Sequence, residues 1–148
     1  MDFPKGFLVS VGGAEDKGTG LEKGIIERNR LNFFELGILS NIINLIKGHD
    51  NPLVEVITTA SSIPDEVGEK YVEAFLKLGC DNIGHMRIRN REDALKPENI
   101  ERIRKCNCVM FSGGNQLRLS SIFGGTQMLD IIKERYKNEH LVIAGTSG

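Results

Sequence analysis

The sequence has little of what a membrane protein, a secreted protein or a nucleic-acid-binding protein needs. No apolar run approaches the ~20 residues of a membrane-spanning helix. The first residues lack the basic-then-apolar layout of a signal peptide. The formal net charge is −1 and no block of like charge occurs, so the basic surface of a nucleic-acid-binding protein is missing. We therefore expect a cytoplasmic protein that binds neither membranes nor nucleic acids.

Cysteine is also scarce. The chain of 148 residues has three, Cys80, Cys106 and Cys108, an odd number in a chain long enough to fold without disulfides. We expect reduced thiols in an intracellular protein. The spacing of Cys106 and Cys108 could supply two metal ligands, but no Cys/His group elsewhere completes a zinc set. We expect no metal and no cofactor.

The sequence does contain a regular alternation of short apolar runs and helical patterns. Hydrophobic residues make up 40% and charged residues 26%, as in ordinary globular proteins. A loop is expected over residues 14–30. Strands are expected at residues 6–11, 53–57, 82–88, 109–111 and 141–144, and helices at 33–46, 64–78, from 97 onward and at 126–137. The alternation predicts a single domain, residues 1–148, with a flavodoxin-like three-layer α/β/α fold and a mainly parallel sheet in the order 2-1-3-4-5.

Small and polar residues follow four of the five expected strands. They are residues 12–17 (GGAEDK), 58–62 (TTASS), 112–116 (SGGNQ) and 145–148 (GTSG). Strand ends generally turn with such residues, which explains any one segment. Because parallel sheets bind ligands outside the carboxyl ends of their strands, the four together favour a site at this edge.

Two of these segments predict a nucleophile and its oxyanion donors. Ser147 directly follows a buried strand, and its small neighbours permit the tight turn of a nucleophile elbow. The main-chain N–H of Gly148 would point at a developing oxyanion, and Gly114 would offer a second N–H from the neighbouring strand end. Taken alone, the GTSG tetrapeptide is a weak signal and favours an ordinary serine turn.

The sequence resembles the cyanophycinase family of serine peptidases in four successive signature segments, residues 12–17, 58–61, 111–119 and 143–147. That family is related to dipeptidase E and to the class I glutamine amidotransferase-like fold. The resemblance implies hydrolysis that releases β-aspartyl-arginine dipeptide units from cyanophycin, an arginine-on-polyaspartate storage polymer. It places the nucleophile at Ser147 and substrate contacts at Asn115 and Gln116. Asn115 stands where the family usually has Asp, a feature shared with dipeptidase E-like relatives, and Gly148 stands where the family usually has Ala.

The family's general-base histidine and its acidic partner follow the nucleophile, and no residue beyond Gly148 is present. The chain is therefore expected to be the N-terminal part of a longer peptidase domain and to be inactive alone. His49 and His140 are expected at the opposite edge of the sheet and His85 within a strand, so none replaces the base. Arg87, Arg89, Arg91 and Arg118 are read as solvated, although Arg118 could bind a carboxylate.

Two other functions stay open. The chain could be a non-catalytic module that binds a small molecule or a partner, or a dipeptidase E-like aspartyl dipeptidase. For the peptidase, the expected partners are a peptide substrate of β-aspartyl-arginine type and a second copy of the chain, because an incomplete sheet leaves apolar surface exposed.

Overall fold

The computed structural model describes residues 3–11 and 33–146, and within them a five-stranded sheet. All neighbouring strands are parallel, which confirms the predicted α/β class. The strands run in the order β1-β5-β4-β2-β3. They are β1 (Phe7–Val11), β2 (Val54–Ile57), β3 (Ile83–Met86), β4 (Cys108–Phe111) and β5 (Val142–Thr146).

The expected order 2-1-3-4-5 is wrong, because β1 lies at one end of the described sheet and pairs only with β5 there. Apolar periodicity identifies a buried strand, but it does not say to which side of the sheet the following crossover returns. The expected neighbourhood of the fourth and fifth strands is confirmed, with Phe111 opposite Gly145.

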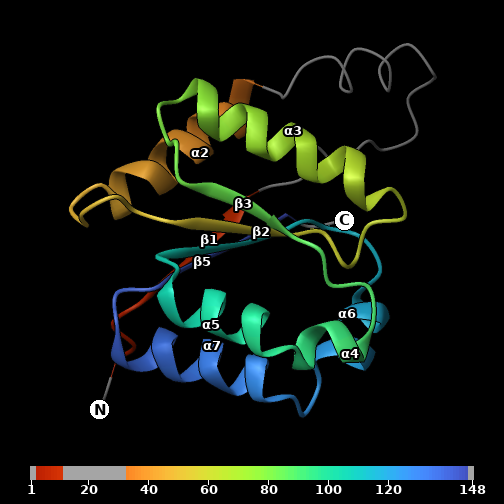
Figure 1. Ribbon diagram of the computed structural model, residues 1–148. Helices are drawn as coiled ribbons and strands as arrows, with labels where there is room; N and C mark the ends of the chain where they lie inside the picture. The colour runs from red at the N-terminus through yellow and green to blue at the C-terminus, as the bar shows by residue number, and fades with distance from the viewer. Residues whose placement is uncertain (1–2, 12–32, 147–148) are drawn as a thin grey trace.

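Helices cover both faces of the sheet and complete the three layers (Figure 1). One face carries α2 (Phe33–Ile46) and α3 (Pro64–Lys77). The other carries α4 (Arg91–Leu95), α5 (Pro97–Lys105), α6 (Gln116–Phe123) and α7 (Gln127–Asn138). No helix in the described part of the chain is long and apolar enough to cross a membrane.

The strands are apolar on both faces because each face has a helical layer to meet. In β4, Cys108 and Met110 pack toward α2 and α3, whereas Val109 packs toward the helices of the other layer. The core on the α2 side includes Leu39, Ile42, Tyr71 and Phe75, and the opposite core includes Ile103, Phe123, Met128 and Ile132.

Three local features differ from the prediction. The sequence predicts Ser62 as the cap of this helix and Pro64 in its first turn. Helix α3 begins at Pro64, but Ile63 is the N-cap residue, and no side chain in the described part of the chain caps it. The Ser61 hydroxyl instead accepts a hydrogen bond from the Ile63 N–H at 3.1 Å. The short helices α4 and α6 were not predicted, because five to eight residues are too few for a clear apolar period.

The three cysteines are buried and unpaired. Burial raises the pKa of the Cys106 thiol to about 12 and raises that of Cys108 as well. Among the described residues, no group of three or more His, Cys, Asp or Glu side chains could hold a metal ion. The cysteines therefore act as small apolar core residues.

One buried ion pair was not anticipated. Glu55 of β2 is 1% exposed, and both of its carboxylate oxygens accept hydrogen bonds from Arg102 of α5, one of them at 2.8 Å. Gly84 on the adjacent strand makes room for the pair, because a Cβ there would lie 2.6 Å from Glu55 Oε1. The pair satisfies a charge that would otherwise be costly to bury.

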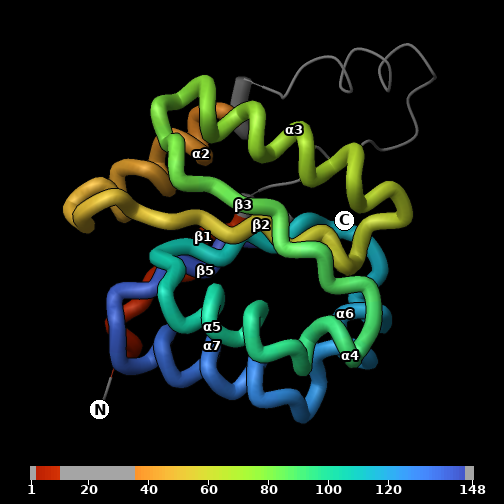
Figure 2. Tube along the Cα trace, viewed as in Figure 1, coloured from red at the N-terminus to blue at the C-terminus, as the bar shows by residue number. Residues whose placement is uncertain are grey.

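Because every strand is parallel, their carboxyl ends meet at one edge of the sheet. Figure 2 shows the strands running toward the right-hand side of the view, where α6 begins and where α3 meets β2. The segments after β2, β3 and β4 therefore gather at this edge.

Candidate functional site

The loop after β4 is attached to the loop after β2 through main-chain atoms. The Asn115 N–H donates to the Ala60 carbonyl at 2.9 Å, and the Ser112 N–H donates to the Ile57 carbonyl at 2.9 Å. Gly114 has a φ of +145°, and a Cβ at this position would lie 2.1 Å from the Ala60 oxygen. Only glycine fits both the conformation and the close approach.

Asn115 positions the start of α6. Its Oδ1 accepts hydrogen bonds from the main-chain N–H groups of Leu117 and Arg118, at 2.9 and 3.3 Å. The side chain is thus an N-cap as well as a predicted substrate contact. Gln116, the first residue of α6, is exposed at the same edge. A substrate role for either residue stays a prediction.

The two predicted oxyanion segments come from adjacent strand ends. Gly114 follows β4 by three residues, and its N–H makes no main-chain hydrogen bond within the described residues. Strand β5 pairs with β4 up to Gly145 and ends at Thr146. Ser147, Gly148 and residues 12–17 lie outside the described residues, so their predicted roles stay predictions.

Ser112 precedes the paired glycines. It is 4% exposed, and its hydroxyl has no hydrogen-bond partner in the described structure. Such a group is uncommon inside proteins. We assign it no role in the site.

The histidines lie away from the end of β5. His140 lies two residues before β5, and its ring meets that of Phe7 edge-to-face, with centroids 4.9 Å apart. The ring of His49 lies 6.3 Å from that of His140. Both therefore lie at the amino end of the strands, as predicted. His85 is within β3, which is separated from β5 by β2 and β4.

The structure also contains a polar cavity that the sequence did not predict as a site. It has a volume of about 180 Å³ and lies at the carboxyl ends of β2 and β3, beside the start of α3. Its lining includes one acidic and three basic side chains: Asp65, Arg87, Arg89 and Arg118. Hydroxyl groups from the loop after β2 and the ring of His85 complete the wall.

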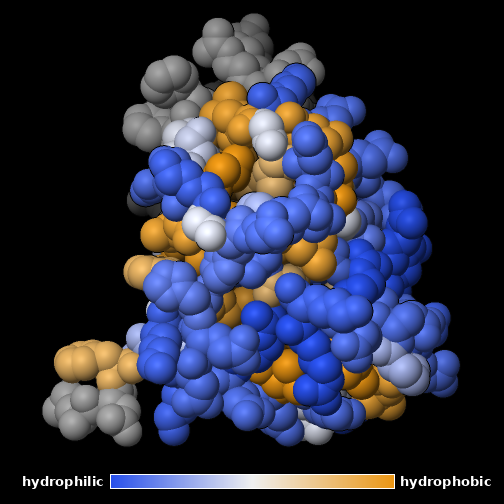
Figure 3. Space-filling model, turned by 60° about the vertical axis from the view of Figure 1, so that its left-hand side comes forward, coloured by the Kyte–Doolittle hydropathy of each residue, from blue (hydrophilic) through white to orange (hydrophobic). Residues whose placement is uncertain are grey.

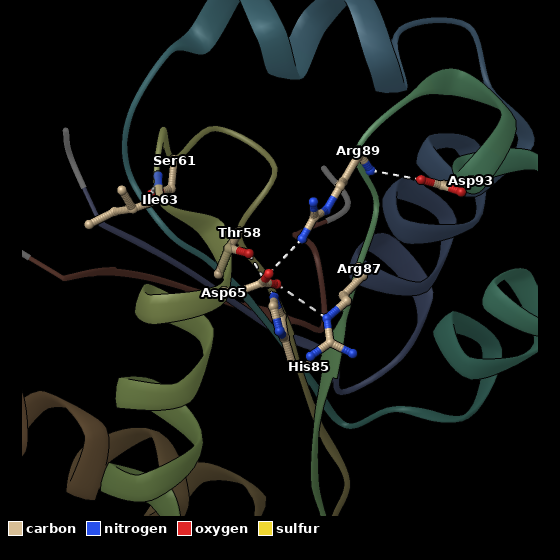
Figure 4. A network of polar contacts seen from close by, with 8 residues as sticks. All are labelled: Thr58, Ser61, Ile63, Asp65, His85, Arg87, Arg89 and Asp93. Carbon is tan, nitrogen blue, oxygen red and sulfur yellow. Dashed lines mark hydrogen bonds and ion pairs between the residues drawn. The ribbon is translucent and has the colours of Figure 1, made fainter.

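Asp65 connects the two arginines that follow β3 (Figure 4). Its carboxylate accepts from Arg87 Nε at 3.2 Å and from Arg89 Nη2 at 2.8 Å. These hydrogen bonds, that of Arg89 first, lower the pKa of Asp65 below 3.8. The arginine side chains are 64% and 55% exposed, so the reading of an exposed face holds for both, but they also line the cavity.

His85 has a structural partner within the same cavity. Its Nε2 lies 2.7 Å from the Thr58 hydroxyl. Burial, and next the charge of Arg87, lower the pKa of His85 below 6.5. The ring is thus neutral at pH 7, and its hydrogen bond fixes the wall of the cavity.

A combination of two patterns could have revealed this cavity. His85, Arg87 and Arg89 recur at every second residue along an extended segment and so share one face. Asp65 lies in the first turn of the helix that crosses this face. The sequence shows each pattern, but not that the start of α3 returns to the end of β3. Arg91, the next residue of this alternation, does not line the cavity and donates to the carbonyl groups of Ser121 and Gly124 instead.

Arg118 links the cavity to the loop after β4. Its Nη1 donates to the Ser61 carbonyl at 3.0 Å, and it lies two residues after Gln116 on α6. The same loop, residues 58–62, thus contacts Gly114 on one side and the cavity on the other.

The sequence matches the model of a peptidase family and is similar to several cyanophycinases. The model of peptidase family S51 matches residues 29–148. A cyanophycinase of Synechococcus elongatus is 29% identical over 143 residues, which cover 97% of this chain and 39% of that protein. Cyanophycinases of Geminocystis herdmanii (strain PCC 6308) and Trichormus variabilis (strain ATCC 29413 / PCC 7937) are 28% and 29% identical over 140 residues. These alignments cover 46% and 42% of the two proteins.

A solved structure shares the fold. The crystal structure of a peptidase from an acI-B1 Actinobacterium has a TM-score of 0.61 and 20% identity to this chain. The similarity covers 75% of this chain and 47% of that one. The chain thus spans less than half of the length of the relatives named here.

Proposed function

Because the chain belongs to peptidase family S51, we propose that it supplies the nucleophile half of a serine peptidase site for β-aspartyl-arginine units of cyanophycin. The proposal gives Ser147 the role of nucleophile and the N–H groups of Gly114 and Gly148 that of oxyanion donors. Asn115 and Gln116 would contact the substrate. The observation that supports it is the parallel pairing of β4 with β5 up to Gly145, from which we expect Ser147 and Gly148 to follow a strand end next to that of β4.

The chemistry follows from these positions. The Ser147 oxygen would attack the main-chain carbonyl carbon of a β-aspartyl-arginine unit while its proton passes to a base. The oxyanion would lie between the two N–H groups, each about 3 Å away. Collapse would break the C–N bond, release the amine of the next aspartate with a proton, and leave an acyl-enzyme that water hydrolyses.

A base is needed from elsewhere. His49 and His140 lie at the amino end of the strands, and His85 lies three strands from β5 with its ring bonded to Thr58. A serine hydroxyl without a base is a poor nucleophile at neutral pH. We propose that the remaining part of a longer peptidase domain supplies the histidine and its acidic partner, and that the 148 residues alone are inactive.

Chemical rescue tests this proposal. The 148-residue chain is incubated with cyanophycin, and released β-aspartyl-arginine dipeptide is measured with and without imidazole as an external base. Without imidazole, we expect no more dipeptide than from the matched Ser147→Ala chain. With imidazole, we expect release from the natural sequence only.

Two outcomes would contradict the assignment of Ser147. One is equal release from both chains, and the other is no rescue at any imidazole concentration. Strong turnover without imidazole that disappears in Ser147→Ala would keep the nucleophile but overturn the claim that a base is missing.

A second candidate is a non-catalytic peptide-binding module. The specific observation in its favour is that all three histidines of the chain are accounted for away from β5. Binding of β-aspartyl-arginine without imidazole-dependent release would support it.

A further inference from the structure

The cavity at the ends of β2 and β3 has a composition suited to an anion. Three arginines and one aspartate line it, so the charged side chains carry a net charge of +2. His85 adds no charge at neutral pH, because burial and the charge of Arg87 lower its pKa below 6.5. A cation would meet repulsion here, whereas an anion would be attracted.

The two arginines after β3 already hold a carboxylate. Asp65 uses Arg87 Nε and Arg89 Nη2, one nitrogen from each guanidinium, as Figure 4 shows. A guanidinium has five N–H donors in a planar fork, so further donors remain on both side chains. Asp65 thus fixes the two arginine side chains and leaves some of their N–H donors available to a ligand.

The rest of the wall supplies fixed polar groups. Ser61 and Thr59 are 8% and 6% exposed, and Thr59 donates to the Ile88 carbonyl at 2.6 Å. Arg118 is held by the Ser61 carbonyl. The amino end of the 14-residue helix α3 also meets the cavity, and no side chain caps it. Its partial positive charge adds to that of the arginines.

The cavity borders the proposed peptidase site. Ala60 contacts Gly114 and Asn115, and the next residue, Ser61, lines the cavity. Neighbouring strands lie about 4.8 Å apart, so the ends of β2 and β3 are roughly 5–10 Å from the end of β4. This separation is within reach of the next unit of a peptide whose carbonyl lies at Gly114.

We propose that this cavity is a carboxylate subsite, which binds a free carboxylate group of the peptide next to the unit being cleaved. The identity of the peptide rests on the proposed function. In an arginine joined to aspartate through its α-amine, the α-carboxylate is free, so every unit of such a polymer offers this group. Arg87, Arg89 and Arg118 are the recognising residues, and Asp65 positions the first two.

A matched pair of small probes tests the subsite without any hydrolysis. N-acetylarginine carries the carboxylate, and N-acetylarginine amide lacks it but is otherwise the same. Each is titrated into the ¹⁵N-labelled full chain carrying Ser147→Ala, and amide chemical shifts are followed. We expect N-acetylarginine to shift the amides of residues 58–62 and 87–89, and the amide probe to bind about tenfold or more weakly.

Two variants separate recognition from general charge. Arg89→Gln should weaken N-acetylarginine binding about tenfold or more, because a charge-assisted hydrogen bond is lost. Arg104→Gln removes the same charge from an exposed position on α5 outside the cavity and should leave binding unchanged. Unchanged spectra away from the cavity in both variants would show that they fold.

Several results would overturn the subsite. These are equal binding of the two probes, no shifts with either, or equal weakening by Arg104→Gln. Inorganic phosphate forms a further arm, and tighter binding of phosphate than of N-acetylarginine through Arg89 would replace the carboxylate assignment. Because binding is measured in Ser147→Ala, failure of the subsite and failure of the nucleophile are distinguishable.

Discussion

At the scale of single residues, the loop after β4 accepts only glycine at position 114. Its positive φ and its contact with the Ala60 oxygen are separate obstacles to a side chain. Gly79 has a φ of +91°, but among the described residues no atom lies within 4 Å of the place of its Cβ. The two glycines therefore separate backbone strain from steric overlap.

We expect Gly114→Ala to lower the free energy of unfolding more than Gly79→Ala. Backbone strain costs about 1–3 kcal/mol in either variant, and only Gly114→Ala adds the clash with Ala60. Urea denaturation followed by circular dichroism measures both. Equal losses of stability would show that the contact with Ala60 relaxes without cost.

Asp65 and its arginines predict a dependence on pH. Hydrogen bonds from Arg89 and Arg87 lower the folded-state pKa below 3.8, so the folded protein holds the carboxylate charged more strongly than the unfolded chain does. The resulting stabilisation is present above about pH 4 and is lost as the pH falls through the folded-state pKa. Both partners are exposed, so the stabilisation is small.

An NMR titration of the Asp65 side chain checks this directly. We expect a midpoint below 3.8 in the natural sequence and a higher midpoint in Arg89→Gln. Arg104→Gln serves as the control and should leave the midpoint unchanged. A midpoint at or above 3.8 in the natural sequence would show that the ion pairs do not persist in solution.

At the scale of helices and strands, replacing glycine by alanine is expected to change stability in opposite directions in α2 and α3. Gly37 lies within α2, and no atom of the described residues lies within 4 Å of the place of its Cβ. Gly68 lies within α3, and a Cβ there would be 2.5 Å from the His85 ring. Helix propensity therefore determines the effect of alanine on stability at residue 37, whereas packing against His85 determines it at residue 68.

We expect Gly37→Ala to raise the free energy of unfolding by about 0.5–1 kcal/mol, the usual gain from removing a helical glycine. Gly68→Ala should lower it by about 1–3 kcal/mol, because the added methyl group displaces a ring bonded to Thr58. Thermal or urea denaturation of the two variants measures the difference in sign. A stabilising Gly68→Ala would show that His85 moves freely.

Most helices and strands could be predicted from the sequence, whereas which of them lie next to one another could not. Thr126 was expected to open the last helix, and it caps α7 by accepting from the Leu129 N–H. By contrast, the pairing of β1 with β5 depends on the path of the whole chain. The cavity at Asp65 was missed for the same reason, because residues from β3 and α3 meet there only in three dimensions.

The segments at the carboxyl edge could be predicted because glycine and small polar residues mark them individually. The buried pair of Glu55 and Arg102 could not, because a glutamate amid valine and isoleucine gives no indication of its partner 47 residues away. Sequence patterns predict individual helices, strands and turns. Ion pairs and cavities between them can be identified only once the three-dimensional fold is known.

At the scale of the whole molecule, apolar residues reach the surface. They appear among hydrophilic ones on the face drawn in Figure 3. Leu8 of β1 is 71% exposed, and Phe7 beside it is 38% exposed. Within the described sheet, β1 hydrogen-bonds on one side only. An edge strand with exposed apolar side chains favours association.

We therefore expect the 148-residue chain to self-associate as its concentration rises, as sedimentation velocity can show. Leu8→Lys should shift the distribution toward monomer, because it places a charge on the edge strand. Leu76→Lys makes the same change on α3, where the leucine is 46% exposed, and should have little effect. A chain that stays monomeric throughout would remove the argument for pairing through β1.

The pairing of the first strand with the last also orders events during synthesis. Val11 ends β1, and Val142, which begins β5, follows it by 131 positions. At about 5–20 residues per second, roughly 7–26 s pass between the synthesis of the two strands. During this interval β2, β3 and β4 can already assemble, whereas β1 has no partner in the described sheet. Within the described sheet, β1 therefore has no strand to pair with until the ribosome has nearly finished the residues that would carry the nucleophile.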